Sequence, residues 1–199
     1  MPRLTLFALV ISLLLLNSSA ARADGKSFQF FVNPLGAILG LYNLGAEFAI
    51  SDRVSIGPEV VIVNSTVSGV FEKTTIKGSG LGLRSHYQFG DRKMIGRGWV
   101  ASAFAFYVPK YSISQTLDNL PALNNTYTGE TSYFVAAATF GYRWLWGFFS
   151  LKLAGGVAYN SLPDDIILTR DSGGSSGTSR YDLKGGLLPA GEVMLGFAF

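Results

Sequence analysis

The sequence predicts an all-β protein, an eight-stranded antiparallel up-and-down transmembrane β-barrel. Hydrophobic residues make up 48% of the chain and charged residues 15%, against roughly a quarter charged in soluble domains. Beyond the N-terminal segment no apolar run reaches the length of a spanning helix, and about eight runs alternate apolar with polar residues. Apolar surface carried by strands predicts a barrel whose outer face meets lipid.

The N-terminal segment has the parts of a secretory signal peptide. Arg3 supplies a positive charge, residues 4–16 form an apolar run, and Ala21 and Ala23 offer small side chains for cleavage. The run is shorter than the roughly 20 residues that a membrane-spanning helix needs. We therefore expect residues 1–23 to be a cleaved signal peptide and residues 24–199 to be an outer-membrane β-barrel domain of a Gram-negative bacterium.

Charge and cysteine content exclude several classes of partner. Cleavage removes Arg3 and Arg22, so the basic residues fall from 16 to 14 against 13 acidic residues. A chain so close to neutral is not expected to bind nucleic acid. Cysteine is absent and histidine occurs once, so we expect neither disulfides nor a metal site. Nothing in the sequence indicates a cofactor.

Four strands are predicted in the first half of the mature chain, over residues 27–36, 42–50, 54–63 and 76–89. A tight turn at residues 51–53 joins the second strand to the third. Pro58 removes a ladder donor from the third strand, which a bulge would accommodate. The fourth strand has the clearest alternation, with large apolar residues on one side and Arg84 and His86 on the other.

Four more strands are predicted over residues 99–113, 131–146, 148–160 and 185–199. In the first of these, Phe104, Phe106 and Val108 share a bulky face, which we expect to meet lipid. Gly147 allows a very tight turn between the second and third.

Short connections alternate with longer polar ones along the chain, as expected of periplasmic turns and outer loops. The longer ones cover residues 66–73, 115–130 and 163–182. The last contains the Gly/Ser-rich residues 171–177, a solvated stretch whose composition cannot form a packed core.

The polar faces of these strands carry charged residues, each a few positions from its short turn. If the bulky faces meet lipid, these side chains form one layer inside the barrel. An unpaired buried ion costs several kcal/mol, so we expect ion pairs that fix the register and fill the lumen. The layer consists of Glu47, Glu59, Arg84, His86, Arg143, Lys152 and Glu192.

We expect no catalytic residue. Ser85 and His86 with a distant Glu would resemble a hydrolase triad, but adjacent strand residues point to opposite faces. An eight-stranded barrel is only just wide enough for its own side chains, which argues against an open pore. A lipid-modifying outer-membrane enzyme and a narrow channel for small solutes remain alternatives.

Aromatic residues gather near the predicted short turns, where rings favour the membrane interface. An aromatic girdle is the simplest interpretation of Phe89, Phe140, Tyr142, Trp144, Trp146, Phe148, Phe149, Phe197 and Phe199. A soluble lipocalin-like barrel is the structural alternative, and it would carry polar residues on its outer faces.

Residues 192–199 resemble the C-terminal signal by which outer-membrane barrels are recognised for assembly, with Phe197 and a terminal Phe199. The resemblance implies that the barrel-assembly machinery is a partner during biogenesis. Met194 stands where that signal often carries Gly, and Gly196 follows instead.

Residues 33–36, 39–47 and 49–57 resemble the start of a small outer-membrane β-barrel family of unassigned function, similar in architecture to the OmpA-type eight-stranded transmembrane barrel. The resemblance implies a monomer without known cofactor or catalytic residues. We therefore expect a non-enzymatic integral outer-membrane barrel with a side-chain-filled lumen, in contact with outer-membrane lipid and lipopolysaccharide. Its expected role is in envelope integrity or in surface interaction through extracellular loops.

Overall fold

The computed structural model describes residues 26–38, 40–69, 72–90, 95–117, 125–170, 178–183 and 185–199, and the predicted signal peptide lies outside them. These residues form one large antiparallel sheet of ten strands, eight of which close into a ring. The all-β prediction is confirmed. The strand count is ten rather than eight, because β8 (Asp165–Arg170) and β9 (Thr178–Asp182) add a hairpin to the ring.

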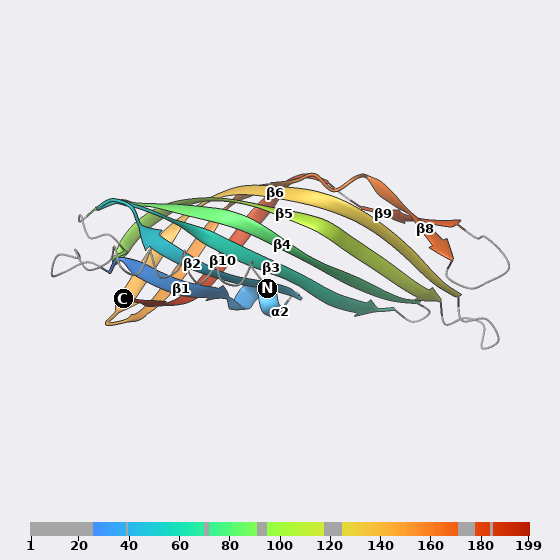
Figure 1. Cartoon of the computed structure of the whole chain (residues 1–199), viewed down its shortest axis with the longest axis horizontal. Helices are drawn as coiled ribbons and strands as arrows, with labels where there is room; N and C mark the ends of the chain where they lie inside the picture. The colour runs from blue at the N-terminus through green and yellow to red at the C-terminus, as the bar shows by residue number, and fades with distance from the viewer. Residues whose placement is uncertain are drawn as a thin grey trace, which may run out of the picture.

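The ring follows the order of the chain (Figure 1). Each strand from β1 to β6 pairs with the next, and β10, the last strand of the chain, pairs with both β7 and β1 to close the ring. The ring strands are β1 (Phe28–Asn33), β2 (Leu41–Ala49), β3 (Val54–Ser68), β4 (Glu72–Gln88), β5 (Gly98–Leu117), β6 (Asn125–Trp146), β7 (Phe149–Asn160) and β10 (Gly186–Ala198).

The two ends of the ring differ. At one end, which we call the turn end, residues 50–53 and 147–148 join neighbouring strands tightly, and Gly147 adopts a φ of 60° that favours glycine. At the other, the long end, β3 to β6 continue well past β1, β2 and β10 (Figure 1). The hairpin of β8 and β9 lies at the long end, where Tyr127 of β6 pairs with Arg170 of β8.

The long end corrects the prediction of polar loops. Residues 66–68 and 72–73 belong to β3 and β4, and residues 115–117 and 125–130 belong to β5 and β6. Thr66 pairs with Thr75 and Thr116 with Thr126, so β-branched polar residues continue the ladder. In the predicted connection over residues 163–182, the β8–β9 hairpin takes up the two ends, and residues 171–177 lie outside the described residues.

The first predicted strand is shorter than expected, because a helix follows it. Strand β1 ends at Asn33, and α2 (Pro34–Ile38) begins at the next residue. Pro34 cannot donate to a ladder but suits the first turn of a helix. The Asn33 side chain caps this helix, since its Oδ1 accepts a hydrogen bond of 3.1 Å from the backbone of Gly36.

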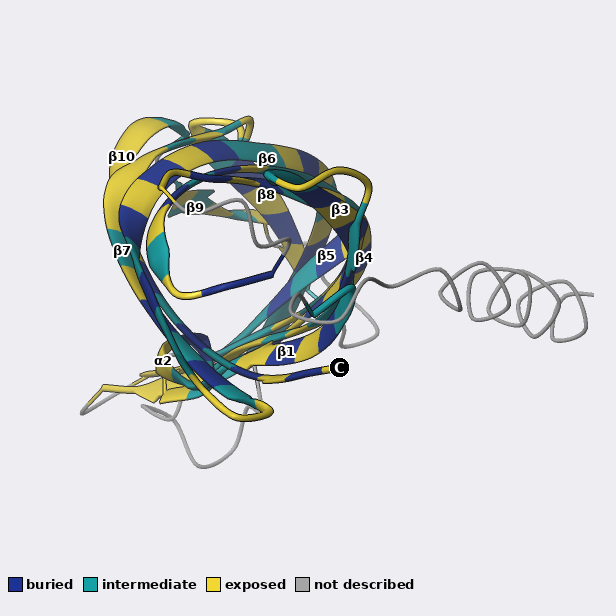
Figure 2. Ribbon diagram, turned by 90° about the vertical axis from the view of Figure 1, so that its left-hand side faces the viewer, coloured by how far each residue is buried: buried dark blue, intermediate teal, exposed yellow. Residues whose placement is uncertain are grey.

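Buried and exposed residues alternate along the ring strands (Figure 2). On β3, Ser55, Glu59 and Val61 are buried, whereas Ile56 and Val60 between them are 38% and 37% exposed. The outer surface is therefore apolar around much of the ring, while charged residues lie inside it. Within the described residues, no helix is long and apolar enough to cross a membrane.

The bulky face of β5 is turned inward, which contradicts the expectation that it meets lipid. Val108 is fully buried, and the Phe104 ring lies 4.1 Å from the Arg84 guanidinium carbon. Arg84 pairs directly with Phe104 across the β4–β5 ladder, and directly opposed residues share one face of a sheet. Alternation groups the residues of a strand into two faces, but the neighbouring strand decides which face is inside.

The interior has an apolar part toward the long end. There Val61, Val63, Val108 and Ile113 pack with Tyr111 and Tyr133, and the hairpin adds Ile166 and Leu168. Each of these eight residues is at most 8% exposed.

Candidate functional site

All seven residues of the predicted layer lie inside the ring. They come from β2, β3, β4, β6, β7 and β10, and none is more than 4% exposed. The structure joins them by contacts into one continuous chain, which we call the charge network. It runs through Glu59, Arg84, Glu192, Lys152, His86, Glu47 and Arg143.

Arg84 organises one half of the charge network. Its Nε and Nη2 atoms donate to the two carboxylate oxygens of Glu59 at 2.9 and 3.0 Å, and its Nη1 donates to Glu192 at 3.0 Å. This forked contact suits the planar guanidinium. The rings of Phe104 and Phe31 lie 4.1 and 5.5 Å from the guanidinium carbon, so aromatic faces also contact the charge.

Glu47 organises the other half. Arg143 Nη2 donates to both of its carboxylate oxygens at 3.0 Å, and the Ser55 hydroxyl donates to one of them. The His86 Nδ1 atom lies 3.2 Å from the second oxygen.

Lys152 joins the two halves. Its ammonium forms an ion pair with Glu192, donates to the Ser102 hydroxyl at 2.7 Å and lies 2.9 Å from His86 Nε2. Because an ammonium only donates, Nε2 must accept, and the single ring proton of a neutral imidazole then sits on Nδ1, facing Glu47. With His86 neutral, three carboxylates balance two guanidiniums and one ammonium.

Neutral polar residues complete the network, and the sequence reasoning did not single them out. Asn43 donates to Glu59 at 2.7 Å and Thr139 to Glu192 at 3.2 Å. Gln29 bonds Ser150 at 2.8 Å nearby. Each occupies an inward position of its strand, so the two-residue period identifies them once the interior face is known.

The arrangement fits mutual neutralisation better than chemistry on a substrate. Ser102 and Lys152 resemble a nucleophile beside a base, but Lys152 donates to the hydroxyl and is itself only 2% exposed. The Ser85 hydroxyl donates to the Ala103 carbonyl oxygen at 3.3 Å, away from the network that holds His86. The Ser85–His86 pairing is therefore not formed. Within the described residues, no group of three or more His, Asp or Glu side chains could hold a metal ion.

The charge network is covered on both sides. Toward the long end lies the apolar cluster around Val108 and Ile113. Toward the turn end Ile95, which is 1% exposed, pairs with Lys26, and the Gln88 side chain bonds the backbones of Gly96 and Arg97.

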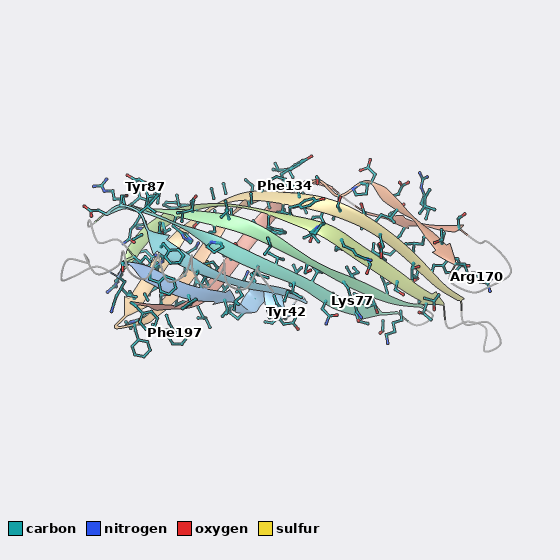
Figure 3. All side chains as sticks on the ribbon, in the orientation of Figure 1. Tyr42, Lys77, Tyr87, Phe134, Arg170 and Phe197 are labelled. Atoms are coloured by element: carbon teal, nitrogen blue, oxygen red, sulfur yellow. The ribbon has the colours of Figure 1, made fainter. Side chains whose placement is uncertain are left out.

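Aromatic side chains gather on the outer surface at the turn end. Tyr87, Phe89, Phe140 and Trp99 form successive ring contacts there, and Phe197 and Phe199 are 49% and 61% exposed. Figure 3 shows Tyr87 and Phe197 near the turn end, Tyr42 and Phe134 nearer the middle, and Lys77 and Arg170 toward the long end.

No protein-family model matches the chain, nor does any curated protein or solved structure with which it was compared.

Proposed function

We propose that the ring is a non-enzymatic transmembrane β-barrel of the bacterial outer membrane, with a sealed lumen and a role in envelope integrity or surface interaction. The observation that carries the proposal is the inverted distribution of polarity. Seven ionisable residues are buried inside the ring, while Leu81, Leu83 and Leu187 on its surface are 71%, 60% and 72% exposed. Burying charged residues and exposing large apolar ones is unfavourable for a protein in water, whereas a barrel that faces lipid requires this distribution.

The outer aromatic residues support a membrane band with two edges. One edge of the band lies at the turn end, where the exposed aromatic residues are Tyr87, Phe140 and Trp99. A second group of exposed aromatic residues lies farther along the ring and consists of Tyr42, Tyr107, Phe134 and Tyr159. Tyr and Trp favour the two interfaces of a bilayer. Beyond the second group, Lys77 and Lys110 are exposed on β4 and β5, as suits a segment in water near lipopolysaccharide phosphates.

The covered charge network supports a scaffold rather than a channel. Ions crossing the ring would have to displace both a paired layer and an apolar layer of side chains. In the proposed orientation the long end and its β8–β9 hairpin face the cell exterior and carry the surface interaction. In this proposal Phe197 and Phe199 serve recognition by the barrel-assembly machinery.

Cell fractionation with a heat-modifiability gel tests the membrane assignment. We expect the mature chain in the outer-membrane fraction, and we expect unboiled and boiled samples to migrate differently because the barrel resists detergent until heated. Recovery in the soluble periplasmic fraction would overturn the proposal and favour the lipocalin-like alternative.

Planar-bilayer recording tests the sealed lumen against the narrow channel. We expect no conductance above the lipid background across an applied voltage range. The conductance of an Arg84→Ala variant, which lacks one large side chain of the charge network, is recorded under the same conditions for comparison. Steady ion conductance of the unaltered protein would establish the channel instead.

The hairpin is tested in cells that lack the protein, by supplying either the full chain or a chain in which a short Gly/Ser linker replaces residues 164–182. We expect the shortened chain to remain heat-modifiable but to fail in restoring the envelope or surface phenotype of the deletion. Full restoration would remove the hairpin from the proposed role.

A further inference from the structure

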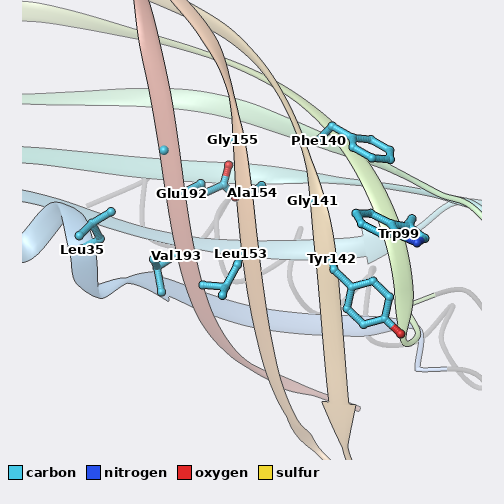
Figure 4. A pocket seen from close by; sticks show the side chains of 11 residues that line it. Leu35, Trp99, Phe140, Gly141, Tyr142, Leu153, Ala154, Gly155, Glu192 and Val193 are labelled. Atoms are coloured by element: carbon cyan, nitrogen blue, oxygen red, sulfur yellow. The ribbon is translucent and has the colours of Figure 1, made fainter.

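A shallow apolar groove of about 430 Å³ lies on the outer face of β6, β7 and β10. Leu35 of helix α2 stands at one end, and Trp99 and Tyr142 stand at the other. Figure 4 shows Leu35, Val193, Leu153 and Tyr142 in a row that crosses these three strands. The groove therefore runs from the aromatic residues of the turn end to helix α2, which follows β1 in the wall of the ring.

Two glycines create the hollow. Gly155 of β7 pairs directly with Gly191 of β10, next to the pair formed by Leu153 and Val193. Neither glycine has a positive φ, so the backbone does not require glycine at these positions. A Cβ on Gly191 would meet nothing within 4 Å, and one on Gly155 would meet only the Ala190 carbonyl oxygen at 3.9 Å. The empty volume is thus open on the outer face.

The groove ends beside a positive charge. Arg97 Nε donates a hydrogen bond of 3.2 Å to the Tyr142 hydroxyl, and both side chains are on the outer surface. Trp99 stacks on Phe140 at 5.2 Å and meets Tyr142 edge-on at 5.4 Å. This end combines an amphipathic aromatic wall with a guanidinium, whose Nη groups suit the oxygens of a phosphate.

We propose that the groove holds one acyl chain of an anionic membrane phospholipid and that Arg97 binds the phosphate of its headgroup, whose negative charge no headgroup cation offsets. The inference rests on the proposed membrane location. The hydrocarbon chain lies over Gly155 and Gly191, between α2 and Trp99, and the phosphate lies at the interface where Trp and Tyr concentrate. A protein partner would not need a cation at one end of an apolar groove, whereas a phospholipid has this order of charge and hydrocarbon.

The experiment uses the folded chain in phosphatidylcholine vesicles with increasing fractions of brominated phosphatidylglycerol, whose bromines quench tryptophan fluorescence. Trp144→Phe and Trp146→Phe make Trp99 the reporter at the groove. Brominated phosphatidylcholine gives the reference for random exchange of surrounding lipid. We expect a several-fold preference of the Trp99 site for phosphatidylglycerol over this reference.

Two variants remove the site from opposite ends, and each has a matched control. Gly155→Leu with Gly191→Leu fills the groove, and Ala103→Leu is the control that places a leucine side chain at an exposed position on β5. Arg97→Gln removes the positive charge at the end of the groove. Its control is Arg53→Gln, which removes a charge at another Arg–Tyr contact, where Arg53 Nη1 donates to the Tyr87 hydroxyl at 3.3 Å. That contact lies beside a separate pocket lined by Ser51 and Asp52. We expect the preference to vanish in the first member of each pair and to persist in the control.

The outcomes separate this inference from the membrane proposal. If the chain does not insert and become heat-modifiable, the membrane proposal itself fails. If it inserts but Trp99 is quenched equally by both lipids, or equally in variants and controls, the phospholipid site is wrong. A change of oligomeric state on filling the groove, without a change in lipid preference, would identify a second copy of the chain as the occupant.

Discussion

At the scale of single residues, the interior depends on complete pairing of charges. Arg84 contacts Glu59 through two hydrogen bonds and Glu192 through a third, and its exposed fraction is 3%. Removing one partner from such a group leaves another charge buried without compensation, which costs far more than the loss of an exposed ion pair. The chain contains a comparison, because Lys110 and Glu130 form an ion pair at the surface with side chains 70% and 58% exposed.

Arg84→Met should lower the free energy of unfolding by about 3–5 kcal/mol, because Glu59 loses its guanidinium partner inside the ring. Lys110→Met should change it by at most about 1 kcal/mol, since water screens the exposed pair. Urea unfolding in lipid vesicles, followed by tryptophan fluorescence, measures both. Equal effects of the two substitutions would refute the view that burial sets the energetic weight of these charges.

A double-mutant cycle tests the Arg143–Glu47 contact. Arg143→Met alone strands the Glu47 carboxylate, whereas adding Glu47→Gln removes that charge and keeps an acceptor for Ser55. We expect the two changes together to destabilise less than the sum of the single changes, with a coupling of about 1–3 kcal/mol. Additive effects in the same unfolding experiment would mean that the two side chains do not interact in the folded protein.

At the scale of elements, the β8–β9 hairpin is attached to the ring by packing more than by pairing. Only Tyr127 and Thr128 of β6 pair with β8, but Ile166 and Leu168 enter the apolar cluster. The hydrogen-bond ladder to β6 is too short to hold the hairpin alone, so its position depends on these two buried side chains.

Leu168→Ala should weaken docking of the hairpin by about 2–5 kcal/mol, because it leaves a cavity where the side chain is fully buried. Ile167→Ala is the control, since the neighbouring side chain is 66% exposed. Hydrogen exchange of β8 amides should become faster in the first variant and stay unchanged in the second, while the ring amides keep their protection. Unchanged exchange of β8 in Leu168→Ala would show that side-chain packing does not hold the hairpin.

At the scale of the whole molecule, the polarity of the surface changes along the long axis of the ring. Leu83 on the ring and Val67 near the long end are almost equally exposed, at 60% and 63%. In water a charge at either position would have a small effect. In the proposed bilayer only Leu83 faces hydrocarbon.

Leu83→Arg should therefore destabilise the protein in vesicles by about 2–4 kcal/mol, whereas Val67→Arg should have little effect, because the cost of a charge depends on its depth in the membrane. Reversible urea unfolding in vesicles provides the measurement. Equal and small effects of both substitutions would indicate that neither residue contacts lipid.

Much of the fold followed from the two-residue period of the chain. The alternation around Arg84 and His86 and the glycine turn at Gly147 predicted strands that the structure contains. Membership of the charge network was also predictable, because Glu47, Glu59 and Lys152 each interrupt an apolar stretch and lie on the polar face of their own strand. These features are local, since a strand's own residues decide which side chains share a face.

Other features depend on contacts between distant parts of the chain. Arg84 meets Glu192 across a sequence separation of 108 residues, and the register of every intervening strand brings them together. The inward face of β5 depends on its ladder with β4, and the β8–β9 hairpin forms because an apolar cluster at the long end accepts Leu168. Such choices are global, because pairing and burial of one strand are settled by its neighbours rather than by its own composition.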